Sequence, residues 1–155
     1  MAAEAEHHTG ISAPPLVYRL DEVSISLTRQ PGSSTAPIQR INLSGTGSAT
    51  LERGGQRMPF RYTPKDTLTL LNAFYKIRFF DLPTNYITRY SVFLKDDDTV
   101  GTSALRMPDT SSTSICITIT ATYEKCVSYS AEVPYELENI TTRIFSEANR
   151  LVNVK

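Results

Sequence analysis

A double glycine inside an alternating run is the feature that most constrains what this chain can fold into. In SATLERGGQRMPFRY, residues 48–62, Gly54 and Gly55 interrupt a segment whose apolar residues recur at every second position. Two glycines can adopt the positive φ angles of a two-residue hairpin turn. A turn at this point places each apolar residue opposite another; the predicted pairs are Arg53 with Gln56, Glu52 with Arg57, Leu51 with Met58 and Ala49 with Phe60. Pro59 cannot donate to a ladder, so its strand is predicted at an edge or a bulge.

Shorter runs of the same period predict more strands. They cover residues 23–27 (VSISL), 38–43, 90–94, 100–105, 114–120 (SICITIT) and 125–130 (KCVSYS). Residues 95–98, Lys-Asp-Asp-Asp, form a polar reversal between two of these runs. This reversal lacks the ligand spacing of a dedicated calcium loop, so a solvated turn is predicted there.

Two segments predict helices. Thr63 is a hydroxyl cap with Pro64 at the first helical position, and Pro134 opens the second helix. The expected apolar stripes are Leu68, Leu71, Phe74 and Tyr75 in the first helix and Leu137, Ile140, Ile144, Ala148 and Leu151 in the second. Strands, helix, strands, helix in this order predict an α+β domain, an antiparallel sheet with two helices packed on one face.

Two adjacent phenylalanines mark the end of the first helix. Phe79 and Phe80 stand in FFDLP, and Pro83 stops the helix from running far past Asp81. The chain must turn back toward the sheet at this point, so we expect both rings to hold the corner in the core. Burial of each ring would contribute roughly 1.5 to 3 kcal/mol.

Length and charge restrict the class of protein. The 155 residues fit one domain, which we place at residues 16–155 after a flexible N-terminal segment of residues 1–15. Sixteen basic and sixteen acidic residues cancel, so no overall field attracts nucleic acid, and no apolar run reaches the roughly 18 residues of a membrane span. The start MAAEAEHHTG is not a signal peptide, although the chain could be the mature part of an exported protein. A periplasmic or extracellular location is expected, and a cytoplasmic one stays open.

Catalytic and metal-binding patterns are scarce. The two histidines, His7 and His8, both lie in the N-terminal segment, so from Thr9 onward the chain lacks the usual general base and metal ligand. The sequence has no G-x-S-x-G, and SGTGSAT, residues 44–50, lacks the lysine and following helix of a phosphate-binding loop. We therefore expect no catalytic residue, no metal, no cofactor and no enzymatic activity.

Cys116 and Cys126 both fall on the polar faces of their predicted strands. If Ile119 faces Val127, Cys126 lies opposite Thr120, about 13 Å along the strand from Cys116, which is too far for a disulfide. A tighter turn centred on Ala121 would place the cysteines opposite each other, but its residues are poor formers of so sharp a reversal. Two free thiols are predicted, with the bridged hairpin as the alternative.

The order of these motifs resembles a bacterial domain family of unknown function that is often found on exported proteins and lipoproteins. The matching stretches are VSISLTRQPG, SGTGSATLERGG, TLLNAFYKIRFFDLPTNY, SICITITATYEKCVSY and VPYELENITTRIF. Members often carry two cysteines just after the first strand, where this chain has QPGSSTAP, so a redox or metal role of that turn does not carry over. The helix, FF-x-LP corner, hairpin and final helix are also similar to a small inhibitor of thermolysin-like metalloproteases.

Two functions are compatible with these patterns. The first is a non-enzymatic binding or inhibitory module of the bacterial envelope or of a secreted protein, with a protein partner and an open oligomeric state. Its partner surface is predicted on exposed loops, at Arg53, Arg57, Gln30, Ser33 and Ser34, because arginine is favoured at interfaces. The alternative is a small hydrolase or redox enzyme whose site is not recognised. RGGQR, residues 53–57, lacks the aromatic neighbours of a nucleic-acid reader, so no nucleic-acid partner is expected.

Overall fold

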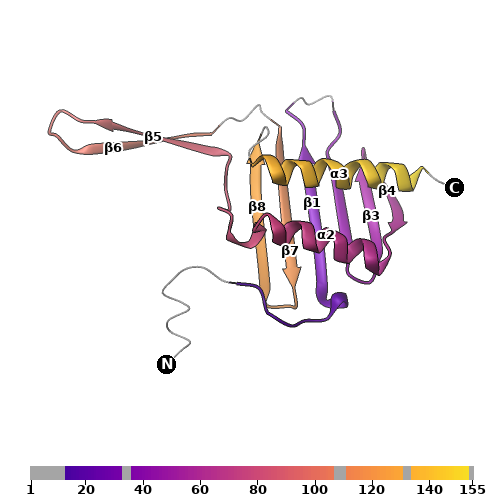
Figure 1. Ribbon diagram of the computed structural model, residues 1–155. Helices are drawn as coiled ribbons and strands as arrows, with labels where there is room; N and C mark the ends of the chain where they lie inside the picture. Colours follow the sequence, from indigo (N-terminus) through magenta and orange to yellow (C-terminus); the bar gives the residue numbers. More distant parts are fainter. Residues whose placement is uncertain (1–12, 33–35, 107–110, 131–133, 154–155) are drawn as a thin grey trace.

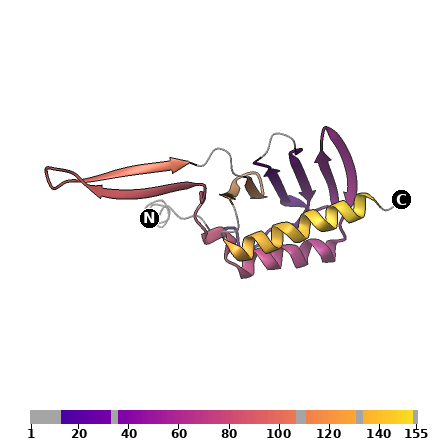
Figure 2. The same ribbon diagram turned by 90° about the horizontal axis from the view of Figure 1, so that it is seen from above.

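The structure, a computed structural model, describes residues 13–32, 36–106, 111–130 and 134–153. Six strands form an antiparallel sheet in the order β4-β3-β2-β1-β7-β8, and both helices cross one face of it (Figure 1). Figure 2 shows the helices in a layer beneath the sheet, while a second, two-stranded sheet of β5 and β6 extends away from the body. The strands are β1 Val23–Gln30, β2 Gln39–Ser44, β3 Ser48–Arg53, β4 Gln56–Arg61, β5 Thr88–Leu94, β6 Val100–Arg106, β7 Ser112–Ile119 and β8 Tyr123–Ser130. The helices are α2 Pro64–Lys76 and α3 Tyr135–Val152, with short 3₁₀ turns η1 Leu20–Glu22 and η2 Phe79–Asp81. The predicted α+β class is confirmed.

The β3–β4 hairpin has the predicted register. Arg53 pairs with Gln56, Glu52 with Arg57, Leu51 with Met58 and Ala49 with Phe60. Gly54 and Gly55 have φ angles of 60° and 84°, the left-handed values that a two-residue turn requires. Pro59 lies in β4, which is an edge strand of the sheet, as its missing N–H predicts.

Helix α2 buries a face slightly different from the predicted one. Thr63 caps it by accepting a hydrogen bond from the Asp66 N–H, at 3.1 Å, and Pro64 is its first residue. Its buried residues are Thr67, Leu70, Leu71 and Phe74. Leu68, predicted to be buried, is 57% exposed and lies beside the N-terminal residues 13–20. The stripe was predicted from apolar spacing alone, and the packed face of the helix is turned toward Leu70.

The Phe79–Phe80 corner lies in the core as predicted. Phe79 is fully buried and Phe80 is 7% exposed. The rings pack edge to face at 5.5 Å, and Phe80 also meets the rings of Tyr75 and Tyr123 at 5.0 and 5.8 Å. The chain turns at Arg78, whose φ of 59° is left-handed, so the corner combines an unfavourable backbone position with dense aromatic packing.

Helix α3 is attached to the sheet by partly buried polar contacts near both ends. At the first end, Glu138 Oε1 accepts hydrogen bonds from the Tyr129 hydroxyl at 2.7 Å and from Arg29 at 2.8 Å. At the other end, the Tyr62 hydroxyl donates to Glu147 at 2.7 Å. Burial raises the pKa of Tyr62, and the hydrogen bond to Glu147 raises it further by a smaller amount. The apolar stripe predicted for this helix is buried, except that Leu151 is only partly so.

Cys116 and Cys126 form a disulfide, so the prediction of two free thiols is wrong. The register of β7 and β8 places the two cysteines directly opposite each other, with their Cα atoms 4.1 Å apart. This register is possible because Thr120 adopts a φ of 57° and its hydroxyl oxygen accepts a hydrogen bond from the Thr122 N–H, at 3.2 Å. The hydroxyl of Thr120 thus stabilises a left-handed backbone conformation that glycine adopts more readily, in a turn that contains no glycine.

Candidate protein-interaction surfaces

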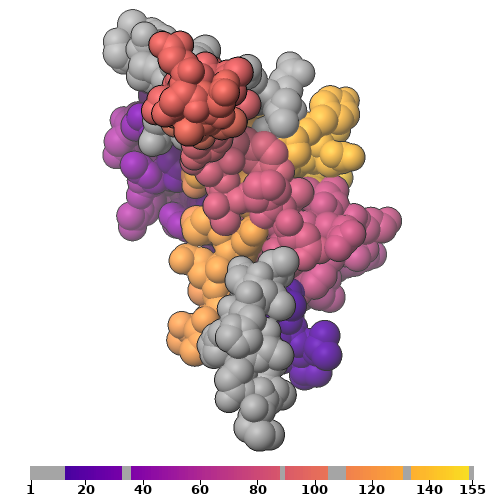
Figure 3. Space-filling view, turned by 90° about the vertical axis from the view of Figure 1, so that its left-hand side faces the viewer, coloured from indigo at the N-terminus to yellow at the C-terminus, as the bar shows by residue number. Residues whose placement is uncertain are grey.

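The arm, which we define as β5, β6 and the turn between them, is a ribbon separate from the six-stranded sheet. Figure 1 shows it extending well beyond the body, and Figure 3, viewed from the arm's side, shows it end-on near the top of the molecule, above α2. Both strands were predicted from their alternation, but their separation from the main sheet was not. An isolated two-stranded hairpin is at best marginally stable in water, so its exposure requires an explanation.

One side of the arm, which we call the arm face, carries a mostly apolar row over three successive cross-strand pairs. Three cross-strand pairs form it: Tyr90 with Ala104, Val92 with Thr102, and Leu94 with Val100. Their four large side chains are far more exposed than a core residue, at 70% for Tyr90, 70% for Val92, 71% for Leu94 and 65% for Val100. A contiguous row of this kind on a soluble domain is a mark of an interaction site.

The opposite side of the arm is less apolar, and the ring of Phe93 covers part of its backbone. Ser91 pairs there with Ser103, and Phe93 lies over Gly101. A Cβ on Gly101 would come within 2.5 Å of the Phe93 ring, so only glycine lets the ring lie flat against the ribbon. The two sides of the arm therefore differ in character, and the arm face is the side available to a partner.

The tip of the arm is acidic and its turn is held by its own residues. The Asp97 Oδ1 atom accepts hydrogen bonds from the hydroxyl and the N–H of Thr99, at 2.5 and 3.1 Å. These two hydrogen bonds, the hydroxyl first, lower the pKa of Asp97 below its ordinary value, so this carboxylate is ionised at neutral pH. Asp98 completes the turn with a φ of 66°, a conformation that aspartate tolerates better than most residues.

The predicted partner residues lie at one end of the six-stranded sheet, but on different faces. Arg53 points to the helix side, where its guanidinium binds the side-chain oxygen of Asn149 in α3. Arg57 lies on the open face and pairs with Glu52, with the closest N to O distance at 2.8 Å. The structure therefore does not bring the two guanidinium groups onto one surface.

The described end of the segment between β1 and β2 lies beside the tip of the β3–β4 hairpin. Gln30 is exposed at the end of β1, whereas Ser33 and Ser34 lie outside the described residues. A Cβ placed on Gly54 would be 3.9 Å from that of Pro37, so the end of the β1–β2 loop lies beside the β3–β4 turn. Arg57 and Gln30 thus stand near one rim of the body, where Glu52 lies between the guanidinium groups of Arg57 and Arg40, at 2.8 and 3.9 Å.

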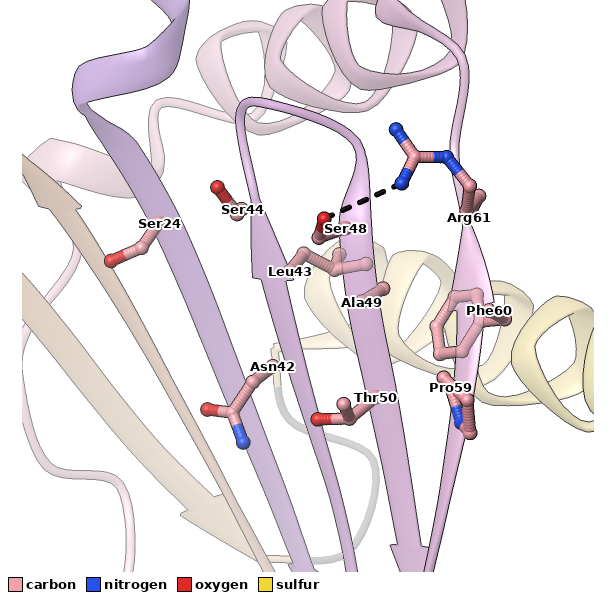
Figure 4. Close-up of a pocket in the computed structure, with 10 residues that line it drawn as sticks. All are labelled: Ser24, Asn42, Leu43, Ser44, Ser48, Ala49, Thr50, Pro59, Phe60 and Arg61. Atoms are coloured by element: carbon pink, nitrogen blue, oxygen red, sulfur yellow. Dashed lines mark hydrogen bonds between the residues drawn. The ribbon is translucent and has the colours of Figure 1, made fainter.

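The open face of the sheet, opposite the helices, carries small polar side chains around a shallow hollow. Figure 4 shows its lining on β1 to β4, with Arg61 reaching to within 3.5 Å of the Ser48 hydroxyl. The hollow has a volume of about 690 Å³ and is lined by Ser24, Asn42, Leu43, Ser44, Ser48, Ala49, Thr50, Pro59, Phe60 and Arg61. Hydroxyl, amide and guanidinium groups there could orient a polar segment of a partner. Its only ionisable lining residue is Arg61, so the hollow offers no acid–base pair.

The metal-ligating residue types meet once in the described part of the chain. Atoms of Cys116, Glu124 and Cys126 lie within 4.8 Å of one another. Because both sulfur atoms are joined in the disulfide, only the Glu124 carboxylate is left to bind an ion, and one ligand does not make a site. Neither helix of the described chain has the length and apolar character needed to cross a bilayer.

Sequence reasoning missed the arm face, although part of its signal is visible. Tyr90, Val92 and Leu94 alternate with polar or self-covering residues, as do Val100, Thr102 and Ala104. This alternation is the pattern of a strand with one buried face, and it was interpreted as such. Nothing in the pattern tells whether the apolar side is covered by the protein's own core or by another molecule.

A comparison of the chain with protein-family models, with curated proteins and with solved structures finds no match.

Proposed function

We propose that this chain is a non-enzymatic protein-binding module of a bacterial envelope or secreted protein, and that it binds through the arm. The observation that carries the proposal is the exposed arm face on a ribbon that stands clear of the body. The buried apolar residues of the body form a single large core. Leu16, Val17 and Leu68 of the body are also exposed, but the arm face is an exposed apolar row that runs along a separate ribbon.

Burial of the arm face on a partner would release a substantial free energy. Each large aliphatic side chain contributes roughly 1.5 to 3 kcal/mol when it is fully buried rather than exposed, and three such side chains, Val92, Leu94 and Val100, line the arm face beside the ring of Tyr90. Part of this gain is spent on ordering the arm and on the lost freedom of the two molecules. The net free energy of binding that remains after these costs fits a specific but reversible interaction.

The disulfide and the family resemblance support the location. Disulfides persist in oxidising compartments such as the periplasm and the extracellular space, and they are rare in the cytosol. The Cys116–Cys126 bridge therefore favours an exported protein. The resemblance to a domain found on exported proteins and lipoproteins points the same way, and cell fractionation with an antibody against the chain would check it.

Site-specific crosslinking tests whether the arm binds. Benzoylphenylalanine would be placed at Val92 on the arm face and, as a matched control, at Glu124 on the open face of the sheet. After irradiation in the envelope fraction of the native organism, we expect crosslinked products from position 92 and none from position 124. Equal labelling at both positions, or none at either, would overturn the assignment of the arm as the binding element.

The similarity to a metalloprotease inhibitor suggests one specific function for the binding module, the inhibition of a thermolysin-like protease. Thermolysin serves as the probe: if the module is an inhibitor of that class, the wild-type protein slows peptide hydrolysis and a Val92→Asp variant does so less. Unchanged hydrolysis at an excess of the protein excludes this form and leaves the binding module intact. Turnover of any substrate that disappears on replacing one side chain would instead favour the enzyme alternative.

A further inference from the structure

We propose that the partner of the arm face is the arm face of a second copy of this chain, so that two arms pack against each other in an antiparallel pair. This inference rests on the proposed function, in which the arm is the binding element, and it names the partner. The first argument concerns charge at the two ends of the arm, and the second concerns the shape of its apolar row.

The two ends of the arm carry opposite charge. The tip contains Lys95 and three aspartates, Asp96 to Asp98, for a formal charge of −2. The base contains two arginines in neighbouring register rows: Arg106 in β6 pairs with Thr88, in a row on the side of the arm face, and Arg89 in β5 pairs with Leu105, in a row on the opposite side. Tip and base are about 20 Å apart along a seven-residue strand, which is about twice the distance over which salt screens charges. Each end therefore requires its own complementary charge from the partner.

Antiparallel pairing supplies that complement without any other protein. When one arm lies on another with its direction reversed, each acidic tip meets the basic base of the other copy. A parallel pair would place tip against tip and base against base, where like charges repel. A twofold axis through the centre of the arm face makes the arrangement isologous and closed.

The apolar row has the symmetry that such a pair needs. Val92 and Thr102 form the central pair, with Tyr90 and Ala104 toward the base and Leu94 and Val100 toward the tip. Reversal places the Leu94–Val100 pair over the Tyr90–Ala104 pair of the second copy, so that the small Ala104 leaves room beside the large aromatic ring. The branched central side chains meet their own counterparts at the axis.

The size of the face sets the strength of the association. A ribbon two strands wide and about 20 Å long buries a few hundred Å² per copy, less than the roughly 800 Å² of a standard interface. The dimer should therefore form at high protein concentration and dissociate on dilution. The two bodies would stand at opposite ends of the paired arms, each with its loops and open sheet face exposed.

Sedimentation equilibrium over a range of concentrations tests the pairing. We expect a monomer–dimer equilibrium for the wild type and at least tenfold weaker association for Val92→Asp. The control Ser91→Asp, on the other side of the ribbon, should keep the wild-type association. Far-ultraviolet circular dichroism and the thermal midpoint verify that both variants keep a folded body.

A charge-exchange pair tests the antiparallel direction. One variant combines Asp96→Lys with Asp98→Asn, which reverses the charge of the tip while keeping a residue that tolerates positive φ. The other combines Arg89→Glu with Arg106→Glu. Each variant alone should associate less than the wild type, because its tip and base then carry charges of the same sign; this loss identifies the antiparallel direction, since a parallel pair already opposes like charges in the wild type. An equimolar mixture should recover dimers, which verifies that both variants still pair.

The outcomes separate this inference from the proposed function. A wild type that stays monomeric while position 92 crosslinks to a different protein overturns the second-copy partner and leaves the binding module standing. Species that grow beyond a dimer would indicate that the arm docks on the body of the next copy, which also overturns the symmetric pair. A monomer with no crosslink from position 92 overturns both.

Discussion

At the scale of single residues, the stability of this domain depends on aromatic side chains at the points where the chain changes direction. Phe80 sits at the end of α2 with three aromatic neighbours, Tyr75, Phe79 and Tyr123. Tyr129 and Tyr62 are buried below α3 and direct their hydroxyls at glutamates of that helix. In both places a large ring supplies the burial, and the hydroxyls of Tyr62 and Tyr129 each donate to a carboxylate.

Replacement of Phe80 by alanine should lower the free energy of unfolding by about 3 to 5 kcal/mol, because a buried ring is lost and a cavity remains. Urea unfolding followed by circular dichroism measures the change. Leu68→Ala in the same part of the fold is the control; since Leu68 is more than half exposed, its loss should be below about 1 kcal/mol. Equal losses in the two variants would contradict the packing account of the corner.

The stability should decrease in alkaline solution because of the buried tyrosines. Burial, reinforced by the contact with Glu138, raises the pKa of Tyr129 to about 12, above its ordinary value of 10.0. Since the folded state holds this proton more strongly than the unfolded state, the stabilisation is complete below pH 10 and is lost as the pH rises toward 12. Denaturant unfolding at several pH values above 9 should show a shallower pH dependence for Tyr129→Phe than for the wild type. Tyr135→Phe, at an exposed position, should leave the slope unchanged.

At the scale of secondary-structure elements, the two consecutive hairpins β5–β6 and β7–β8 are stabilised in different ways. The β7–β8 hairpin packs against β1, presents Ile115, Ile117 and Ile119 to the core and carries the disulfide on its outer face. The β5–β6 hairpin has no sheet neighbour within the described residues and relies on its turn and on Phe93. The first hairpin is therefore a structural element of the body, whereas the second is available for association.

Removal of the disulfide should destabilise the β7–β8 hairpin and with it the whole sheet. The bridge closes a loop with a sequence separation of 10, for which the loss of unfolded-chain entropy is worth about 2 to 4 kcal/mol. The double variant Cys116→Ala, Cys126→Ala should show this loss in urea unfolding. A thiol titration of the denatured, unreduced protein should find no free thiol at these positions, and detection of two would contradict the bridge.

At the scale of the whole molecule, the body and the arm are separate structural units. The six-stranded sheet, α2 and α3 enclose one continuous core, and none of the arm residues whose burial is described, 90–104, belongs to it. The arm leaves the body after residues 84–86, which run beside the edge strand β8 and exchange backbone hydrogen bonds with Ser128. That contact covers part of an edge of the sheet and anchors the residues that precede the arm to the body.

Replacement of residues 88–106 by a short Gly-Ser linker should leave the body folded. The first and last residues of the arm, Thr88 and Arg106, are cross-strand partners, so a short linker can join the ends. We expect the free energy of unfolding to change by less than about 1 kcal/mol, since no core contact is removed. A much larger loss would show that the arm is part of the folding unit, and sedimentation of the same variant should show a monomer.

The sequence by itself determined the elements with a strong local pattern. The double glycine and the apolar alternation specified the β3–β4 register to the residue, because a slip by one position would turn every buried side chain to the solvent. Capping residues located both helices, and the FFDLP corner was correctly assigned to the core. These features depend on contacts between residues close together along the chain, so their physics is contained in a short segment.

Only the tertiary structure decided the disulfide and the arm. The pairing of Cys116 with Cys126 depended on whether a threonine would accept a left-handed backbone, and this choice is favoured by the packing of β7 against β1 and by the hydrogen bond from the Thr120 N–H to Glu22. The apolar alternation of β5 and β6 predicts a face that avoids water, but does not specify what covers it. Residues 84–86 already pair with β8, and Pro59 has no N–H to donate to a further strand beside β4, so the β5–β6 hairpin lies outside the six-stranded sheet.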